Sequence, residues 1–528
     1  MSILNAISVN ARSMRWFCLP VLLLASCQNQ EPRSISNVGN NYLLIDSTMH
    51  AADIIEKAAN IAPSPRQLKW QQKELVAFIH FGINTFTNRE WGTGQEDPAL
   101  FNPTALDAEQ WVRSLKDAGF KEVILTAKHH DGFCLWPSAY TTHSVKNSPW
   151  KGGKGDVVRE LADACHKYGV DLGIYLSPWD RNYPFYGNTE KYNAYFEHQL
   201  TELLTNYGKV TEVWFDGANG EGPNGKVPEY HFQSWYQLIR RLQPEAVISV
   251  MGPDVRWVGT ESGYGRDTEW SVVSLSEQDP EQIAANSQQQ VLPKDSLFKP
   301  RRGMSQQKDL GSREKILHSK ALAWYPAETN TSIRPGWFYH ADQDAKVKSP
   351  EKLYDTYFNS VGKNGVFLLN FPPDTRGLIH EQDLENIKAW RVLLDSTFRV
   401  NLAAGAAVES TDGIGSEAIL DGVDTTYWTT NGADTTGVLE LTLNAPRTFD
   451  VLALQENIHI GQRIEAFRLD VWADGAWKEV TSGTTVGYKR LLRFDAVTTD
   501  KVRLSILASR SNPTLSEFGL YKRPAAVE

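Results

Sequence analysis

The segment between residues 122 and 176 decides the fold class. It reads EVILTAKHH over 122–130, DVVRELADACHKYG over 156–169 and VDLGIYL over 170–176. Two apolar runs of strand length flank a stretch with apolar residues on one helical face. An aspartate precedes its first turn and a glycine follows its last. Strand, helix and strand in this order predict a unit of two parallel strands with a helical crossover.

The same alternation extends to both sides of this unit. Amphipathic stretches such as 107–119 separate apolar runs of strand length, and the first four runs begin 40–48 residues apart. Near-continuous apolar strands with helical crossovers predict a parallel sheet covered on both faces. We predict an α/β fold with a (β/α)8-like barrel over 48–397, and a doubly wound sheet is the alternative. The eight runs assigned as strands are 76–81, 122–127, 170–175, 210–215, 246–251, 268–273, 321–325 and 366–371.

The pattern changes after about residue 398. Short apolar runs separated by Gly, Asp and Thr replace the helical periodicity, as in GVLELTL (437–443), FRLDVW (467–472) and VRLSI (502–506). Turns at this spacing are typical of antiparallel sandwiches. We therefore predict an antiparallel β-sandwich over 398–528, with the linker near 397–404.

The start of the chain has the features of a secretory signal. Arg12 and Arg15 precede the apolar run WFCLPVLLLA (16–25), which is too short to cross a bilayer. The run ends in LASC (24–27), which resembles a bacterial lipobox, where cleavage before the cysteine exposes a thiol that receives lipid.

We therefore predict a signal peptide over 1–26, lipidation of Cys27 and a polar tether over 27–47. A plain signal peptide with an incidental cysteine is the alternative. The expected location is the bacterial cell envelope, with the protein facing the periplasm or the cell surface and contacting the membrane only through its lipid.

The composition excludes several classes of protein. The chain has 528 residues, with 54 Lys and Arg against 63 Asp and Glu, a net charge of −9 and no long basic run. It is therefore a poor candidate for a nucleic-acid binder. Four cysteines in this length exclude a disulfide framework, and Cys134 and Cys165 suit core positions. Neither a CxxC nor an HExxH pattern occurs, so we predict no catalytic metal.

Polar and aromatic side chains follow the first four predicted strands. A histidine at a strand end is usually structural, and an Asp-Gly pair there is usually a turn. The carboxyl ends of barrel strands, however, meet at one rim. Four successive strands that bring such groups to this rim therefore favour an active site. These groups are His80, Lys128-His129-His130, Tyr175 with Trp179, and Trp214-Phe215-Asp216.

Aromatic faces beside carboxylates and imidazoles suit a sugar ring, whose C–H face stacks while its hydroxyls form hydrogen bonds. Hydrolysis of a glycosidic bond needs two carboxyl groups. Asp216 is the expected nucleophile, because it ends an apolar strand in an aromatic setting. The acid has to come from a neighbouring strand or loop, and the candidates are Glu261, Asp267, Glu269 and Glu328.

Seven stretches between about residues 70 and 375 carry a family resemblance. They are HFGINTF (80–86), REW (89–91), KHHDGFCLW (128–136), GIYLSPW (173–179), VWFDGANG (213–220), RWVGTESG (256–263) and RPGWFYH (334–340). In this order they resemble glycoside hydrolase family 29, the α-L-fucosidases. The resemblance implies an exo-acting, retaining enzyme that needs no cofactor, with the Asp of the WFDG motif, Asp216, as its nucleophile.

The resemblance also assigns the remaining site residues. In the subfamily that removes α-1,3- and α-1,4-linked fucose, the acid/base is a Glu in a VG-x-E context about 45 residues beyond the nucleophile, which corresponds to Glu261. The broader subfamily places its acid/base less regularly. The positions that hold fucose correspond to His80, Glu90, Trp91, His129, His130, Tyr175 and Trp337. For Trp337 the alternative is a structural role in the core, within a Pro-Gly turn.

The C-terminal part is similar to the discoidin-like modules of the family 32 carbohydrate-binding type. The matching stretches are AILDGVDTTYW (418–428), LQENIHIGQRIEAFRLDVW (454–472) and GTTVGYKRLLRF (483–494). Such modules often hold a structural Ca²⁺ and sometimes bind galactose. The resemblance implies a Ca²⁺ ion near Asp421 and Asp424, although an Asp-Gly turn without metal gives the same pattern.

Three functions therefore remain open. The chain could be an α-1,3/1,4-L-fucosidase acting on Lewis-type glycans, a broad α-L-fucosidase that also cleaves α-1,2 linkages, or a glycan-binding lipoprotein without activity. The presence of both Asp216 and Glu261 argues against the last. The role of 281–313, which is rich in Gln and Lys, and the oligomeric state are left open by the sequence.

Overall fold

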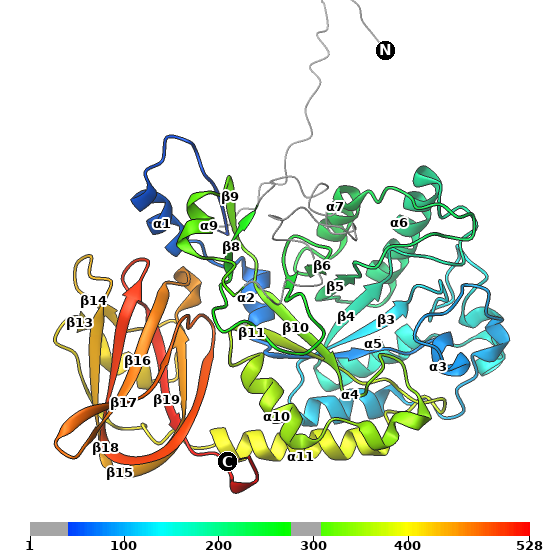
Figure 1. The fold of residues 1–528 in the computed structure, drawn as a ribbon. Coiled ribbons are helices and arrows are strands. Elements are labelled where there is room, and N and C mark those ends of the chain that lie inside the picture. Colours follow the sequence, from blue (N-terminus) through cyan, green and yellow to red (C-terminus); the bar gives the residue numbers. More distant parts are fainter. Residues whose placement is uncertain (1–40, 276–307, 528) are drawn as a thin grey trace, which may run out of the picture. The chain divides into compact units, whose positions relative to one another are not determined.

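The computed structural model describes residues 41–275 and 308–527, and its ribbon is shown in Figure 1. The expected signal peptide, Cys27 and the tether up to residue 40 lie outside the described residues, as does 281–307. In the two described ranges, no helix is long and apolar enough to span a bilayer.

Eight parallel strands form the barrel, and the predicted fold class is confirmed. Around the ring, each strand pairs with the next, and β11 pairs with β2. A parallel bridge between Ser249 and Val255 joins β6 to the start of β7 and completes the ring. The strands are β2 (Leu75–Ile79), β3 (Glu122–Lys128), β4 (Asp171–Leu176), β5 (Glu212–Phe215), β6 (Val247–Val250), β7 (Arg256–Trp257), β10 (Ala327–Ser332) and β11 (Gly365–Asn370).

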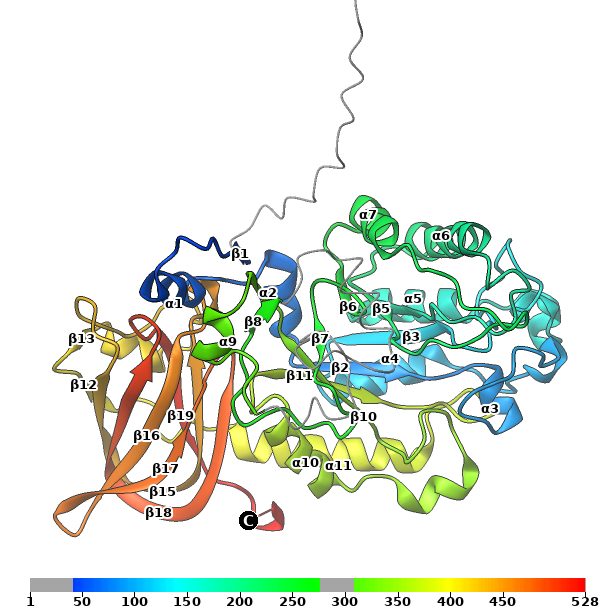
Figure 2. The same ribbon diagram turned by 45° about the horizontal axis from the view of Figure 1, so that its top comes forward.

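Helices cover the outside of this ring (Figure 2). The two helices expected from capping signals are confirmed. The side chain of Asp107 accepts a hydrogen bond from the N–H of Gln110 at the start of α4, and α5 ends at Gly169 with φ of 65°. The α-helices of the barrel are α3 (Ile83–Thr87), α4 (Ala108–Asp117), α5 (Val157–Tyr168), α6 (Thr189–Asn206), α7 (Phe232–Leu242), α10 (Pro350–Asn359) and α11 (Glu381–Phe398). Short 3-10 helices are η1 (Pro98–Leu100), η2 (Val145–Asn147), η3 (Trp150–Gly153) and η5 (Ala341–Lys346).

Two of the eight runs assigned to the barrel were wrong. The runs at 268–273 and 321–325 contribute to β8 (Val272–Leu275) and β9 (Ala321–Trp324), which pair antiparallel outside the ring. The barrel instead uses β7, which has only two residues, and β10, whose sequence AETNTS is polar. A search for apolar runs misses β7 because it is too short. It misses β10 because the side chains of this strand are polar and form hydrogen bonds with residues of other strands.

The last residues of the range predicted as a tether contain a strand. Residues 42–44 form β1 (Tyr42–Leu44), which pairs antiparallel with β9. The next helices are α1 (Ala51–Ala59) and α2 (Pro65–Gln71), and α9 (Arg313–Leu317) follows later in the chain. Apolar side chains of α1, β8, β9 and α9 form a small cluster of their own beside the barrel core.

The C-terminal part is antiparallel throughout, as predicted. The runs at 437–443, 467–472 and 502–506 fall in β15, β16 and β18. The main sheet has the order β12-β15-β18-β16-β17, and β19 pairs with β15. A separate apolar core that includes Trp428 and Phe467 lies beneath these strands. The strands are β12 (Ala407–Glu409), β13 (Gly413–Ile414), β14 (Thr429–Thr430), β15 (Gly437–Glu456), β16 (Ile464–Ala473), β17 (Ala476–Gly483), β18 (Arg490–Ser509) and β19 (Leu515–Tyr521), with 3-10 helices η6 (Ser416–Leu420), η7 (Ile458–Ile460) and η8 (Ala525–Val527).

The two cysteines in the described part of the chain are core residues, as predicted. Cys134 and Cys165 are both buried free thiols. Burial raises the pKa of the Cys165 thiol, so it stays protonated at neutral pH.

Candidate active site

A pocket of about 150 Å³ opens at the carboxyl ends of the barrel strands. This volume is below the roughly 300–1,000 Å³ of pockets for drug-sized ligands, so it suits one small ring. Of the residues predicted to act on the sugar, all but Tyr175 line it, and Tyr175 reaches it through a hydrogen bond to Asp216. The lining residues are Phe78, His80, Glu90, Trp91, His129, His130, Trp214, Asp216, Ala218, Glu261, Asn330 and Trp337.

Neighbouring donors hold the carboxylate of Asp216 in one orientation. It follows β5, and its Oδ1 accepts a hydrogen bond of 2.6 Å from the N–H of Ala218. Its Oδ2 accepts one of 3.1 Å from the hydroxyl of Tyr175. Burial and the charge of Asp216 raise the pKa of Tyr175 far above its usual value, so this hydroxyl keeps its proton. The Asp216 side chain is 25% exposed, so it remains accessible to a substrate.

Only one of the four candidate acids lines the pocket. Glu261 lies in the loop after β7, where the indole N–H of Trp337 donates to its Oε2 at 3.3 Å. Glu269 is buried between Arg256 and Arg266, and Asp267 pairs with Lys363 on the surface.

The surroundings of Glu261 favour its protonated form. Burial raises the pKa of this carboxyl, and the negative charges of Asp216 and Glu90 raise it further. The hydrogen bond from Trp337 acts in the opposite direction, because it stabilises the anion. A carboxyl of raised pKa beside a second carboxylate is typical of the general acid and nucleophile of a glycosidase.

Two of the three histidines present an unprotonated nitrogen to the pocket. His130 Nδ1 lies 2.7 Å from the hydroxyl of Ser177, which donates to the carbonyl of Trp179. A hydroxyl has one proton to donate, so the Nδ1–H of His130 is the donor to Ser177. His80 Nδ1 contacts Asn370 Oδ1 at 2.9 Å, and the same oxygen accepts from the His80 backbone N–H.

The Nε2 atoms of His80 and His130 can therefore accept hydrogen bonds from hydroxyl groups of a ligand. Burial lowers the pKa of His80 to about 3 and also lowers the pKa values of His129 and His130, so the imidazoles are neutral. A pocket with neutral imidazoles therefore suits the hydroxyl groups of a ligand better than it suits an anionic ligand.

The carboxylate of Glu90 anchors the loop that carries Trp337. Its Oε2 accepts a hydrogen bond of 2.8 Å from the backbone N–H of Trp337, and its Oε1 lies 2.6 Å from His340 Nε2. The Trp337 ring lies 5.0 Å from the ring of His80, and its side chain is only partly buried. It therefore lines the pocket, whereas the alternative placed it in the core. Trp91, 56% exposed, meets the ring of His130 edge to face at 5.6 Å.

Several residues of the site were missed from the sequence. Asn330 lines the pocket from β10, and Asn370 orients His80 from the end of β11. Glu328, by contrast, was named as a candidate acid, but it is buried, and its two oxygens share the indole N–H of Trp214 at 3.1 and 3.2 Å. A polar strand was the available signal, since the carboxylate and amide of AETNTS need partners when buried. His340 was part of the RPGWFYH motif, but no role was assigned to it.

The Asp421 region shows the contacts of a turn. Asp421 accepts hydrogen bonds from the N–H of Val423 and the hydroxyl of Thr426, and Asp424 accepts one from Gln72. These side-chain oxygens do not assemble the six to eight oxygen ligands that Ca²⁺ prefers. Among residues 41–275 and 308–527, no group of three or more His, Cys, Asp or Glu side chains could hold a metal ion. A Ca²⁺ ion at this loop stays a prediction.

A closed (β/α)8 barrel with an oriented carboxylate, a second carboxyl of raised pKa and neutral imidazoles around a small pocket defines a glycosidase. The sequence profile of the family described as alpha-L-fucosidase matches residues 70–391, and that of the F5/8 type C domain matches residues 403–518. The chain belongs to glycoside hydrolase family 29 and is an α-L-fucosidase that carries a discoidin-like C-terminal domain.

Similar proteins span nearly the whole chain. Alpha-L-fucosidase 1 of Arabidopsis thaliana is 43% identical over 500 residues, which cover 92% of this chain and 91% of that protein. A crystallised Bacteroides ovatus protein assigned to the α-L-fucosidases has a TM-score of 0.80 and 49% identity, covering 92% of this chain and 78% of that one. A family 29 fucosidase of Ruminococcus gnavus in complex with fucose has a TM-score of 0.77 and 31% identity. The match covers 89% of this chain and 96% of that one.

The contacts of Glu261 predict a pH dependence. If Glu261 is the acid, kcat/KM falls as the pH rises through its pKa, because the anion has no proton to donate. Trp337→Phe removes the donor that stabilises the anion, so the alkaline limb moves to higher pH. Glu90→Gln removes a negative charge, so the limb moves to lower pH. The measurement is kcat/KM for an aryl α-L-fucoside across pH. Trp477→Phe, in the C-terminal domain, is the control. A shift to lower pH in Trp337→Phe, or to higher pH in Glu90→Gln, would contradict this assignment.

Proposed function

We propose that this enzyme hydrolyses fucosides with retention, through a covalent intermediate on Asp216. The observation that carries the proposal is the fixed carboxylate of Asp216, held by Ala218 and Tyr175, in the same pocket as Glu261, whose pKa is raised by burial. A retaining mechanism needs a nucleophile and an acid/base, with their carboxyl groups about 5–5.5 Å apart.

The proposed reaction has two steps. Asp216 attacks the anomeric carbon of fucose while Glu261 gives its proton to the glycosidic oxygen, so the bond to the leaving sugar breaks and a fucosyl ester forms. Glu261, now a carboxylate, then takes a proton from a water molecule whose oxygen attacks the anomeric carbon. The ester bond breaks, fucose leaves, and both carboxyl groups return to their starting states. His80, His129 and His130 hold the sugar hydroxyls, and Trp337 faces the apolar side of the ring.

Removing the nucleophile tests this mechanism. Asp216→Ala should lower kcat/KM for an aryl α-L-fucoside at least about 10³-fold, because no covalent intermediate can form. Asp163→Ala, on the exposed face of α5, is the matched control and should keep full activity. Treatment with a chelator should leave the wild-type rate unchanged, since both carboxyl groups act without a metal. NMR should detect α-L-fucose as the first product, and β-L-fucose would exclude retention.

We further propose that the enzyme prefers α-1,3- and α-1,4-linked fucose of Lewis-type glycans. The support is the position of Glu261, which lies in the VG-x-E context that the narrower subfamily uses and lines the pocket beside Trp337. The alternative is a broad α-L-fucosidase that also accepts α-1,2 linkages.

A substrate panel separates the two specificities. The wild-type enzyme should hydrolyse Lewis a and Lewis x trisaccharides with kcat/KM about 100-fold or more above that for 2′-fucosyllactose, which corresponds to about 2.7 kcal/mol of transition-state discrimination. Fucose release measured by chromatography gives both values under the same conditions. Values within a few-fold of each other would favour the broad enzyme.

We also propose that the protein is a lipoprotein of the bacterial envelope, on the strength of the signal-like run at 16–25 and the LASC sequence that ends in Cys27. Expression of the full chain in a bacterium should place fucosidase activity in the membrane fraction. Cys27→Ala should move it to the soluble fraction, because the lipid has no attachment site. Cys18→Ala, within the segment that is cleaved off, should change nothing. Equal fractionation of all three proteins would contradict the anchor.

A further inference from the structure

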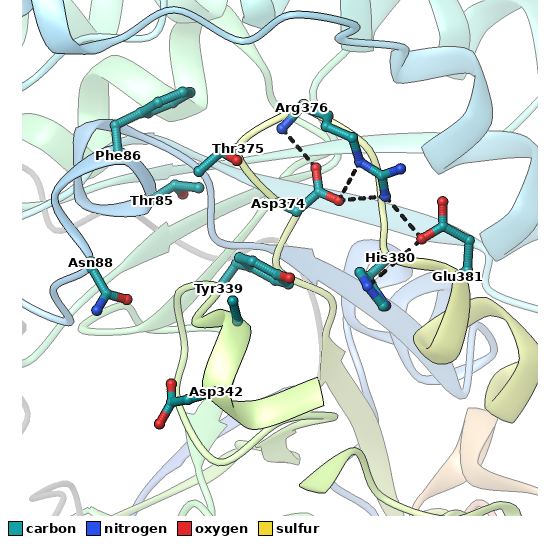
Figure 3. Close-up of a pocket in the computed structure, with 11 residues that line it drawn as sticks. Thr85, Phe86, Asn88, Tyr339, Asp342, Asp374, Thr375, Arg376, His380 and Glu381 are labelled. Carbon is teal, nitrogen blue, oxygen red and sulfur yellow. Dashed lines mark hydrogen bonds and ion pairs between the residues drawn. The ribbon is translucent and has the colours of Figure 1, made fainter. Parts of the chain in front are cut away.

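A second pocket lies on the same rim of the barrel. Its volume is about 620 Å³, four times that of the catalytic pocket. Figure 3 shows that its side chains come from α3 and from the loops that follow β10 and β11. These elements all follow carboxyl ends of barrel strands, so both pockets open at one end of the barrel. The lining residues are Thr85, Phe86, Asn88, Tyr339, Ala341, Asp342, Asp374, Thr375, Arg376, His380 and Glu381.

The two pockets share one wall. His340 Nδ1 lies 2.5 Å from Oδ1 of Asn88, which lines the second pocket. The other ring nitrogen of His340, Nε2, lies 2.6 Å from Oε1 of Glu90, which lines the catalytic pocket. One imidazole ring therefore separates polar groups of the two pockets. On the same loop, Trp337 lines the first pocket and Tyr339 lines the second.

The polar groups of the second pocket suit hydroxyls better than charged ligands. Its one guanidinium, on Arg376, is bound by Asp374 at 2.6 Å and by Glu381 at 2.9 Å, as Figure 3 shows. Asp342 is a third carboxylate in the lining, so carboxylates outnumber the one guanidinium and an anionic ligand is disfavoured. His380 Nδ1 accepts a hydrogen bond from the N–H of Gln382, so the proton of the ring is on Nε2. That nitrogen already lies 3.6 Å from Oδ2 of Asp344 and 3.7 Å from Oε2 of Glu381.

Apolar surface completes the lining. Phe86 packs edge to face against Phe101, and the ring of Tyr339 stacks on that of His380 with centroids 5.9 Å apart. Aromatic walls with a few polar groups at fixed positions are typical of small-molecule sites, and 620 Å³ lies within their range of roughly 300–1,000 Å³.

We propose that this second pocket is a subsite for an uncharged sugar unit of the fucosylated glycan, beyond the fucose. The inference rests on the proposed function, because it takes the catalytic pocket to hold the fucose. A pocket of about 150 Å³ leaves the remaining sugars of the substrate on the rim. The second pocket, one imidazole ring away, offers them carboxylates as acceptors and an aromatic wall.

Filling the pocket tests the proposal. Ala341 and Ala345 are both exposed on η5, but only Ala341 lines the pocket. Ala341→Trp should lower kcat/KM for a Lewis trisaccharide and for a larger neutral fucosylated oligosaccharide about tenfold, mainly through KM. It should leave an aryl α-L-fucoside within twofold of wild type, and Ala345→Trp should leave all substrates unchanged. Wild-type values for the oligosaccharides in Ala341→Trp, or an equal loss on all substrates, would overturn the subsite.

A binding experiment separates this proposal from the proposed function. N-acetyllactosamine, a neutral disaccharide without fucose, should bind the wild-type protein in an NMR saturation-transfer titration. Its Kd should rise about tenfold in Ala341→Trp and several-fold in Asp342→Asn, and a sialylated form should bind more weakly. Unchanged binding in both variants would overturn the subsite. If the wild-type protein released no fucose from any substrate, the proposed function would fail, while this titration would still decide what the second pocket binds.

Discussion

The buried carboxyl of Glu328 connects the barrel interior to the catalytic site. It is 1% exposed, and burial raises its pKa to about 8. Both of its oxygens lie within hydrogen-bond distance of the Trp214 indole N–H, and the Trp214 ring stacks on Tyr175 with centroids 5.2 Å apart. Tyr175 in turn donates to Asp216. A buried polar group needs a partner, so this contact orients an aromatic wall and, through Tyr175, the carboxylate of Asp216.

A second set of polar contacts controls the opposite side of the pocket. The carboxylate of Glu90 accepts hydrogen bonds from the backbone N–H groups of Trp337 and Phe338 and contacts the imidazole of His340. One carboxylate thereby holds the loop whose indole reaches Glu261. The loop also separates the two pockets, so its placement affects both the pKa of Glu261 and the shape of the second pocket.

The barrel and most of the residues that line its pocket could be predicted because their signals are local. Helix α5 begins and ends where its capping residues indicate, and the strand ends that carry His80, His129, His130 and Asp216 stand directly after apolar runs. Two strands were not predicted, because the assignment looked for runs of apolar residues and these two strands have none. Strand β10 is polar since Glu328 and Asn330 bond to tryptophans of other strands, and β7 has only two residues.

The sequence by itself determined the alternation of strands and helices, the pairing of a nucleophile-like Asp216 with the candidate Glu261, and the family. These follow from residue type, spacing and motif, which are local properties of the chain. Only the tertiary structure decided which candidate acid lines the pocket, which ring nitrogens of His80 and His130 are free, and that a second pocket lies behind His340. Each of these depends on residues far apart in the chain: Glu261 meets Trp337, His80 meets Asn370, and Asn88 meets His340 only when the ring of strands is closed.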